Sequence, residues 1–434
     1  SYALRFPEKT GEISPAPLLP PAPSDTIEKK LGALGNMRRF FCALLLAAAL
    51  PLAGCSPIPA GPDPALPPAM PVQAASAEPE SEPEAEPQPE PEPEDEPQPE
   101  PEPEPLESGG DVLLFGQRTA ALCQPDGTLL IPAAAFAERG GLSYGEADDW
   151  AELRHLGDRI RFPLCGPFTT AVRQDSTVWI PFERAAAHFG FVSGTASDGT
   201  PYCAREVSLS APAADINVPV LMYHAVGDET WGYSDLFVRP QDLEAQLQYL
   251  ADNGYETIWF EDLSHLEDYE KPVILTFDDG YDDNYTELYP LLQKYQAKAT
   301  IFVIPRDLGK AHKMTAEQIQ ELADSGLVSI QSHTWSHGNL SQMDEATLIF
   351  EMEESRNAIA ALTGQVPYVV CYPEGTRSDL SIAVARRYYA YGLLMNGYVY
   401  NTSDDPFYVQ RMFIPRGQTG IEWNVRDAGT HRGW

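Results

Sequence analysis

The sequence predicts an α/β protein whose C-terminal half is built on a parallel sheet, preceded by a small α+β domain and a Pro/Glu-rich linker. Strands written as continuous apolar runs alternate with helices over residues 215–434, and a short motif occurs twice within residues 109–205. Apolar strands of this kind are typical of parallel sheets, because helices cover both faces. A barrel and a doubly wound sheet both fit. In either architecture, functional groups gather at the C-terminal ends of the strands.

Composition limits the choice of partners. The chain has 434 residues with a formal net charge of −35, and its 43% of hydrophobic residues can supply a sizeable core. The negative charge argues against nucleic acid and anionic lipid head groups as partners. Much of this charge lies between Glu78 and Glu107, so it describes a linker more than a binding face. A neutral or cationic polymer remains open as a substrate.

The N-terminal part carries targeting and tether signals. Within residues 37–55, a positive stretch and a short apolar run end in "LAGC" at Cys55. This pattern resembles the signal peptide and lipobox of bacterial lipoproteins, which implies export and lipidation of Cys55. A plain anchor helix is the alternative, although a spanning helix needs roughly twenty apolar residues. Residues 1–36 are expected to lie upstream of the mature protein, and residues 56–108 to form a disordered linker that favours polyproline II.

Residues 109–205 are expected to form the small α+β domain. "DGTLLIPAAAFAERGGLSYG" (126–145) parallels "DSTVWIPFERAAAHFGFVSG" (175–194), each with an acidic turn, a strand ending in Ile-Pro, and a helix. The domain resembles the stalk-type domain named after the N-terminal region of copper amine oxidases. His155 and His188 stand alone, so we expect them to be packing residues. We assign the domain a spacer or wall-contact role.

The C-terminal region alternates strands and helices. Strands are predicted at residues 218–226, 255–260, 271–277, 298–304, 327–333 and 368–373, and helices at residues 240–254, 285–296, 315–326 and 343–364. We expect Asp282 and Asp283 to cap the helix that starts near Tyr285, because carboxylates there accept free N–H groups and favour the helix dipole.

Polar side chains follow four of these strands. They are His224, Asp278 and Asp279, His333 and His337, and the segment Tyr372 to Gly375 in "CYPEG". The C-terminal ends of neighbouring parallel strands meet at one edge, so we expect these groups to converge. The i, i+4 spacing of the two histidines would place both rings on one face of a helical turn.

Two imidazoles and one carboxylate suffice to hold a catalytic zinc-like ion with an open position for water. A second carboxylate, not ligated, can then take a proton from that water. Adjacent aspartates at a strand end point in different directions, and the glycine of "DDG" allows a sharp turn beneath them. An EF-hand calcium loop is excluded, because the glycine falls too early and no glutamate closes the loop. The iron-binding triad of two histidines and one carboxylate stays open.

"TFDDG" followed by "SHTWSH" resembles the polysaccharide deacetylases, carbohydrate esterase family 4 with the NodB-homology fold, over roughly residues 215–425. The resemblance implies a distorted (β/α) barrel that removes acetyl groups from N-acetylated sugars with a divalent metal. We expect zinc, with cobalt or nickel open. The resemblance implies that Asp278 is the general base. It implies three metal ligands, which are Asp279, His333 and His337.

The "CYPEG" stretch occupies the place of the family's third motif. Its tyrosine, or a neighbouring backbone N–H, helps to bind the oxyanion in the family. By position, this implies substrate contacts for Tyr372, Pro373 and Gly375. Trp335, between the two histidines, is either a platform on which a sugar stacks or a packing residue.

Two positions depart from the family pattern. Cys371 stands where the third motif often begins with an arginine that positions the base, and the C-terminal Leu-x-His is missing from "MFIPRGQTGIEW". We assign the general acid to His224, with His431 as the weaker candidate. The reason is that "PVLMYHAV" is similar to the branch that deacetylates poly-N-acetylglucosamine at cell surfaces.

These residues predict a metal-dependent N-deacetylase acting on peptidoglycan or poly-N-acetylglucosamine, lipid-anchored to the bacterial membrane and facing the cell wall. One alternative is an inactive deacetylase fold that binds carbohydrate at the surface, which the missing arginine and the changed C-terminal motif favour and the complete Asp/His/His set disfavours. The other is an O-acetyl polysaccharide esterase, since the same chemistry attacks esters and amides. Four further cysteines can form one or two disulfides in an exported protein; they are Cys123, Cys165, Cys203 and Cys371.

Overall fold

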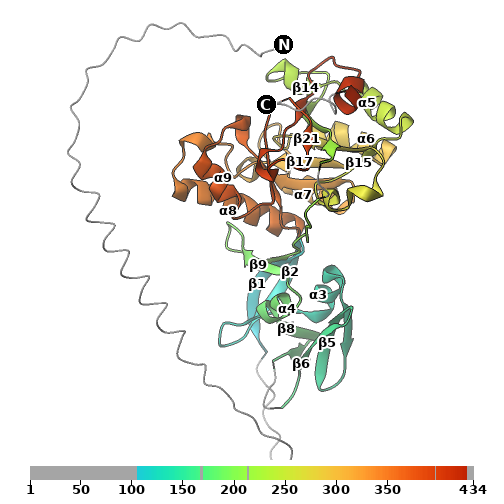
Figure 1. Ribbon diagram of the computed structural model, residues 1–434. Coiled ribbons are helices and arrows are strands. Elements are labelled where there is room, and N and C mark those ends of the chain that lie inside the picture. Colours follow the sequence, from blue (N-terminus) through green and yellow to red (C-terminus); the bar gives the residue numbers. More distant parts are fainter. Residues whose placement is uncertain (1–104, 167–169, 213–214, 396, 428–434) are drawn as a thin grey trace, which may run out of the picture. The chain divides into compact units, whose positions relative to one another are not determined.

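The computed structural model describes residues 105–166, 170–212, 215–395 and 397–427 (Figure 1). They belong to one compact unit that spans residues 97–434. The predictions for residues 1–36, for the signal segment with Cys55, for nearly all of the linker and for His431 lie outside the described residues. Among the helices of the described ranges, none is both long and apolar enough to span a membrane.

The first described part is a separate mixed β domain. Its seven-stranded sheet has the order β7-β8-β3-β2-β1-β10-β9, and a three-stranded sheet has the order β4-β5-β6. The strands are β1 (Glu107–Leu114), β2 (Gln117–Cys123), β3 (Leu129–Pro132), β4 (Ser143–Glu146), β5 (Trp150–His155), β6 (Asp158–Pro163), β7 (Val172–Gln174), β8 (Thr177–Pro181), β9 (Val192–Thr195) and β10 (Pro201–Ala204). The helices are α3 (Ala133–Gly140) and α4 (Phe182–His188).

The predicted repeat is confirmed as two strand–helix–strand units, β3-α3-β4 and β8-α4-β9. Each helix follows a proline with nearly the same backbone angles, φ −62° and ψ 117° at Pro132 and φ −60° and ψ 119° at Pro181. The two Ile-Pro strands pair antiparallel, with Ile131 opposite Ile180, and both isoleucines are fully buried. The repeat therefore places two equivalent strands side by side in the sheet.

The C-terminal part is a parallel α/β domain with a curled, open-barrel sheet, as the sequence predicts (Figure 1). The strand order is β20-β19-β18-β17-β16-β12-β22, with β15 beside β16. The sheet strands are β12 (Val220–Tyr223), β15 (Glu256–Thr257), β16 (Pro272–Phe277), β17 (Ala299–Val303), β18 (Val328–Ser332), β19 (Val369–Cys371), β20 (Tyr391–Leu393) and β22 (Met412–Phe413). Short pairs are formed by β11 (Asn217–Val218) with β21 (Tyr400–Asn401), and by β13 (Ala225–Val226) with β14 (Phe237–Val238).

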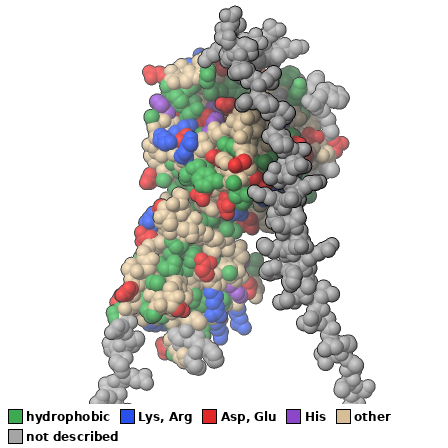
Figure 2. All heavy atoms as spheres, turned by 90° about the vertical axis from the view of Figure 1, so that its left-hand side faces the viewer, with side chains coloured by type: hydrophobic (Ala, Val, Ile, Leu, Met, Phe, Trp, Pro, Cys, Tyr) green, Lys and Arg blue, Asp and Glu red, His purple; other side chains and the backbone are tan. Residues whose placement is uncertain are grey.

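Five α-helices accompany this sheet. They are α5 (Pro240–Asp252), α6 (Tyr289–Tyr295), α7 (Ala316–Asp324), α8 (Glu345–Thr363) and α9 (Asp379–Ala385). Every residue of β12, β17 and β18 is buried, as expected for strands of a parallel sheet that is covered on both faces. On the face shown in Figure 2, acidic, basic and hydrophobic side chains are interspersed.

One segment nearly closes the barrel. Val409 forms an isolated parallel bridge with Leu393 at the end of β20, and Met412 and Phe413 pair with β12. The chain thus passes from one edge of the sheet to the other within a few residues. Arg411 lies in the middle of this crossing and is fully buried.

Two predicted elements differ from the structure. The strand predicted over residues 255–260 is formed only at Glu256–Thr257, and the chain then enters a 3-10 segment at Glu261–Asp268. The helix predicted from residue 285 begins as a π-turn at Asn284–Leu288 and continues as α6.

The predicted caps at Asp282 and Asp283 are wrong, because the helix start has no side-chain cap hydrogen bond. The Asp283 carboxylate instead accepts a hydrogen bond from Asn284 Nδ2, which also donates to the His224 carbonyl oxygen just before β13. Burial raises the pKa of Asp283 to about 7. This carboxyl is thus linked, through Asn284, to the chain just before β13.

Candidate metal and catalytic site

Three strand ends, taken from a run of four neighbouring parallel strands, build the site. β12 runs parallel to β16, and β16 runs parallel to β17 and then β18. His224 follows β12, Asp278 and Asp279 follow β16, and His333 follows β18. Because these strands are parallel neighbours, their C-terminal ends bring all four side chains to one edge of the sheet.

The predicted ligand atoms lie at distances that suit one small divalent ion. Asp279 Oδ1 is 3.6 Å from His333 Nε2 and 3.4 Å from His337 Nε2. Donor atoms about 2.1 Å from a tetrahedral zinc would be about 3.4 Å apart. The three residues form a candidate metal site in which all ligand atoms lie within 4.8 Å of one another. The residues therefore fit the ion that the sequence predicts.

His333 is oriented and kept neutral by its surroundings. Its Nδ1 lies 2.8 Å from the carbonyl oxygen of Cys371. A carbonyl only accepts hydrogen bonds, so Nδ1 carries the proton and Nε2 presents its lone pair to the site. Burial lowers the pKa of His333 to about 4. The imidazole is thus unprotonated at neutral pH, the form that a metal requires.

The predicted helical turn between the two histidines is wrong. Residues 333–337 form a bend with left-handed backbone at Thr334 (φ 63°) and His337 (φ 57°). The bend still brings the rings together, with centroids 4.8 Å apart. Trp335 within the bend is half-buried, and its ring lies edge-on to Phe350 with centroids 6.3 Å apart.

The predicted sharp turn after β16 is present. Asp279 and Gly280 both have left-handed backbone, with φ of 73° and 62°. A Cβ at residue 280 would lie 3.1 Å from Val303 Cγ1, so glycine serves both the turn and the close approach of β17. Lys313 Nζ donates to the Asp279 carbonyl oxygen at 2.7 Å and so supports the turn from outside.

Arg411 occupies the role that the sequence analysis found unfilled at Cys371. Its guanidinium donates to both oxygens of Asp278, each at 2.7 Å. It also donates to Cys371 Sγ at 3.0 Å and to Thr276 Oγ1 at 3.1 Å. The arginine comes from the segment that closes the barrel, about forty residues after Cys371. The one signal in the sequence is a charged residue inside the apolar stretch "YVQRMFI".

This pair fixes the state of Asp278. The carboxylate is 1% exposed, and burial alone would oppose its ionisation. The Arg411 guanidinium nevertheless holds the pKa of Asp278 well below its usual range. Burial raises the pKa of the Cys371 thiol well above its usual value, so this group stays protonated. Because Arg411 binds both oxygens of Asp278 and contacts Cys371 Sγ, the second cluster of Asp278, His333 and Cys371 is the poorer candidate for a metal.

His224 lies beside Asp278, with 3.8 Å between Nε2 and Oδ2, and is 7% exposed. Burial lowers its pKa, while Asp278 and Asp279 act in the opposite sense. Its carbonyl oxygen accepts a hydrogen bond from Asn284 Nδ2 at 3.0 Å. His224 Nδ1 and Asn284 Oδ1 are both buried without a hydrogen-bond partner among the described residues.

The structure places the Tyr372 side chain in the core, and its expected substrate contact stays a prediction. Its side chain is fully buried, and its hydroxyl donates to the Phe407 carbonyl oxygen at 3.3 Å. Its backbone N–H donates to the Leu393 carbonyl oxygen at 3.2 Å. A tyrosine after an apolar strand packs inward here because β20 carries Gly392, where a Cβ would lie 2.1 Å from the tyrosine oxygen.

Pro373, Gly375 and the cysteines are the remaining parts of the prediction. Pro373 is buried, whereas Gly375 is partly exposed with φ of 65°. Their substrate contacts stay predictions. The disulfides expected for an exported protein are not formed in the described residues, where all four cysteines are free.

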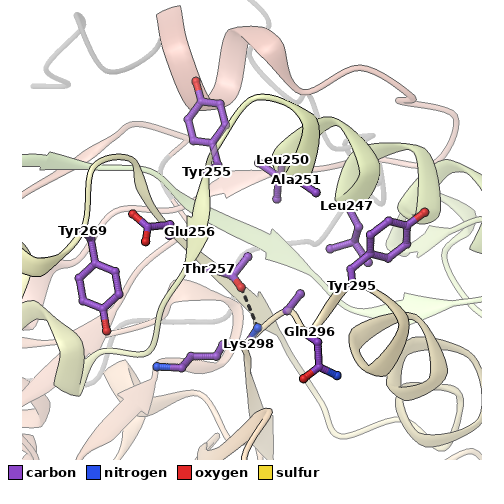
Figure 3. A pocket seen from close by; sticks show the side chains of 11 residues that line it. Leu247, Leu250, Ala251, Tyr255, Glu256, Thr257, Tyr269, Tyr295, Gln296 and Lys298 are labelled. Carbon is purple, nitrogen blue, oxygen red and sulfur yellow. Dashed lines mark hydrogen bonds between the residues drawn. The ribbon is translucent and has the colours of Figure 1, made fainter.

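A pocket of about 260 Å³ lies elsewhere in the domain (Figure 3). Thr257 of β15 and Lys298, just before β17, belong to its lining, together with Tyr255, Tyr269 and Tyr295. Thr257 and Lys298 lie near the N-terminal ends of β16 and β17. The candidate metal ligands follow the C-terminal ends of β16 and β18, at the opposite edge of the sheet. The pocket is therefore separate from the candidate site.

Comparisons with known proteins find similarity in the part of the chain that contains this site. The family model described as "Polysaccharide deacetylase" matches residues 265–391. YxkH of Bacillus subtilis, a protein named for the polysaccharide deacetylases, is 35% identical over 175 residues, which are 39% of this chain and 61% of that protein. The poly-beta-1,6-N-acetyl-D-glucosamine N-deacetylase of Escherichia coli is 31% identical over 136 residues, which are 27% of this chain and 20% of that enzyme. The chain thus spans less than two thirds of each of these relatives.

Among solved structures, the chain is similar to the Streptococcus pyogenes deacetylase PplD, with 28% identity and a TM-score of 0.46. The alignment covers 50% of this chain and 100% of that one. The matched residues place a polysaccharide deacetylase domain in the C-terminal part of the chain. The stalk-type resemblance of residues 109–205 stays a prediction.

Replacement of Arg411 by methionine should destabilise the protein by about 3–5 kcal/mol at pH 7, because Asp278 would remain buried without its partner. The wild-type pair contributes stability above the ordinary pKa of aspartate, about 3.9, and loses it as the pH falls through the depressed pKa. In the variant, Asp278 takes up a proton more readily. The stability difference should therefore shrink as the pH is lowered. Urea denaturation at several pH values measures it.

The matched control for this experiment is the double variant Arg411→Met/Asp278→Asn. It removes both charges and should be more stable than the single variant at pH 7. A single variant as stable as the wild type would show that the pair does not hold Asp278 in place.

Replacement of His333 or His337 by alanine should lower zinc affinity at least tenfold, because each supplies one of three donor atoms. Asp278→Asn should retain zinc, since Asp278 is engaged by Arg411 rather than by the ion. Titration calorimetry and metal content after dialysis measure both. His265→Ala, at an exposed histidine, is the control. Equal zinc content in His333→Ala and wild type would refute the ligand assignment.

Proposed function

We propose that the protein is a metal-dependent deacetylase that hydrolyses N-acetyl groups of an N-acetylglucosamine polymer at the cell surface or in the cell wall. One observation carries this proposal. Three donor atoms spaced for a divalent ion lie beside an ionised carboxylate, Asp278, and an imidazole, His224. This combination suits amide hydrolysis by water, which needs a proton acceptor for the water and a proton donor for the amine.

Asp279, His333 and His337 would hold the cofactor, with zinc expected and cobalt or nickel open. When bound, such an ion lowers the pKa of a water molecule toward neutrality and polarises a carbonyl. The neutral state of His333 and its hydrogen bond to the Cys371 carbonyl support this role, because they present Nε2 without competition from a proton.

Asp278 is proposed to accept the proton of the attacking water. Both of its oxygens bind Arg411, so the carboxylate cannot rotate and remains ionised throughout the neutral range. The same contacts lower the basicity of the Asp278 carboxylate. It can therefore accept a proton only from a water molecule whose pKa has already been lowered. Arg411 acts through Asp278 and is therefore a positioning residue.

His224 is proposed to deliver a proton to the departing amine. Burial disfavours its charged form, while the adjacent carboxylates favour it. Nε2 faces Asp278 Oδ2 at 3.8 Å, so the two groups lie close enough to act on one substrate. Asn284 holds the His224 backbone through the carbonyl oxygen.

The inactive, carbohydrate-binding alternative loses its main support. It rested on the absence of an arginine beside the proposed base and on the changed C-terminal motif, and Arg411 supplies the arginine from another segment. The names of the Escherichia coli and Staphylococcus aureus relatives, poly-beta-1,6-N-acetyl-D-glucosamine N-deacetylases, favour an N-acetylated polymer over an O-acetylated one. Peptidoglycan is the second polymer that we propose.

We further propose that the protein is exported and anchored to the membrane through a lipid on Cys55. The support is the sequence pattern of residues 37–55 and the Pro/Glu-rich stretch that follows it. Mass spectrometry of protein extracted from membranes should find a lipidated N-terminal Cys55. The variant Cys55→Ala should leave the membrane fraction. An intact N-terminus upstream of Cys55 would overturn the anchor.

The proposed activity is tested by acetate release from peptidoglycan, poly-N-acetylglucosamine, chitooligosaccharides and acetylxylan, with and without a chelator. We expect release from an N-acetylated polymer and its loss with the chelator. Asp278→Asn should lower turnover about a hundredfold or more, because the proton acceptor is lost.

The outcomes separate the alternatives. Release from acetylxylan alone would indicate the O-acetyl esterase. Metal binding and polymer binding without any release would indicate the carbohydrate-binding alternative. Normal turnover by Asp278→Asn would sink the assignment of the base, whatever the substrate.

A further inference from the structure

An exposed tryptophan is held in an aromatic cluster beside the candidate site. Trp231 lies between β13 and β14 and is 42% exposed. Its ring stacks on His312 with centroids 4.2 Å apart and planes 11° apart. It meets Phe237 and Tyr281 edge-on, with centroids 4.9 Å and 4.8 Å apart.

Single exposed hydrophobic residues are common and carry no meaning by themselves. Trp231 differs because three rings from separate segments fix its orientation while much of its own surface remains in water. Aromatic pairs of this kind stabilise the arrangement beyond the area that they bury. A surface residue with no role needs no such support, whereas a binding platform does, since rigidity lowers the entropy cost of association.

Two contacts connect this cluster to the candidate metal site. Tyr281 lies two residues after Asp279, in the turn that follows β16. Lys313 Nζ lies 3.9 Å from the centre of the Tyr281 ring and donates to the Asp279 carbonyl oxygen at 2.7 Å. Lys313 thus links the candidate ligand Asp279 to Tyr281, whose ring meets Trp231.

We propose that Trp231 is a platform on which a pyranose ring of the polymer stacks, next to the unit whose acetyl group is hydrolysed. This inference rests on the proposed function. A pyranose offers a face of polarised C–H groups that suits the electron-rich face of indole. A polymer substrate necessarily extends beyond the reacting unit. Only the Tyr281 ring separates Trp231 from the turn that carries Asp279, so the cluster lies where a neighbouring unit would pass. Tyr233, in the same loop and 84% exposed, can extend the platform.

The proposal predicts how activity depends on chain length. Wild-type kcat/KM for acetate release should be higher for a hexamer of N-acetylglucosamine than for the dimer. In Trp231→Ala the hexamer-to-dimer ratio should fall about tenfold, and in Trp231→Phe by a smaller factor, as expected for loss of one stacking contact. The control Tyr295→Ala truncates an aromatic that lines the pocket of Figure 3 and should keep the wild-type ratio.

Hexamer binding to Asp278→Asn, with and without Trp231→Ala, is measured by titration calorimetry as a second readout. If the wild type releases acetate and Trp231→Ala keeps both the ratio and the affinity, the platform is refuted while the proposed function stands. If no variant releases acetate but Trp231→Ala weakens hexamer binding about tenfold, the platform is supported and the proposed function fails. Circular dichroism checks that each variant is folded.

Discussion

The buried ion pair between Arg411 and Asp278 is the interaction on which the rest of the site depends. Neither group has access to water, and removal of two charges from water is costly. The cost is offset because two parallel hydrogen bonds of 2.7 Å join the guanidinium to both carboxylate oxygens. The pair also connects the segment that nearly closes the barrel to the end of β16. Catalytic geometry and barrel closure therefore rely on the same two side chains.

Adjacent Asp278 and Asp279 avoid mutual repulsion because different partners compensate them. Asp278 faces inward to a permanent cation, Arg411, whose pKa lies far above neutrality. Asp279 faces His333 and His337, which leave room for an exchangeable cation. One carboxylate is thus neutralised by the protein and the other by a ligand. Under the proposed function, this division lets one dipeptide supply both a proton acceptor and a metal ligand.

The sequence was sufficient for features that depend on strand order. Apolar runs predicted the parallel strands, and the residues directly after them, Asp279 and His333, do meet. It was insufficient where the tertiary structure decides. Arg411 reaches Asp278 only because the chain crosses between β20 and β12. The residues around Arg411 do not predict that crossing. Tyr372 has the position of a site residue, but the missing side chain at Gly392 leaves space for it in the core.

The backbone at the site shows why helix spacing was a poor guide to the histidines. Asp279, Thr334, His337 and Glu374 all have φ between 53° and 73°, a region that costs non-glycine residues of order 1 kcal/mol or more each. Three of them lie in or next to the predicted ligand set, and the fourth lies in the loop after β19. Such backbone persists only where its surroundings enforce it. The donor atoms are consequently fixed by the fold itself, so that an arriving ion need not order them.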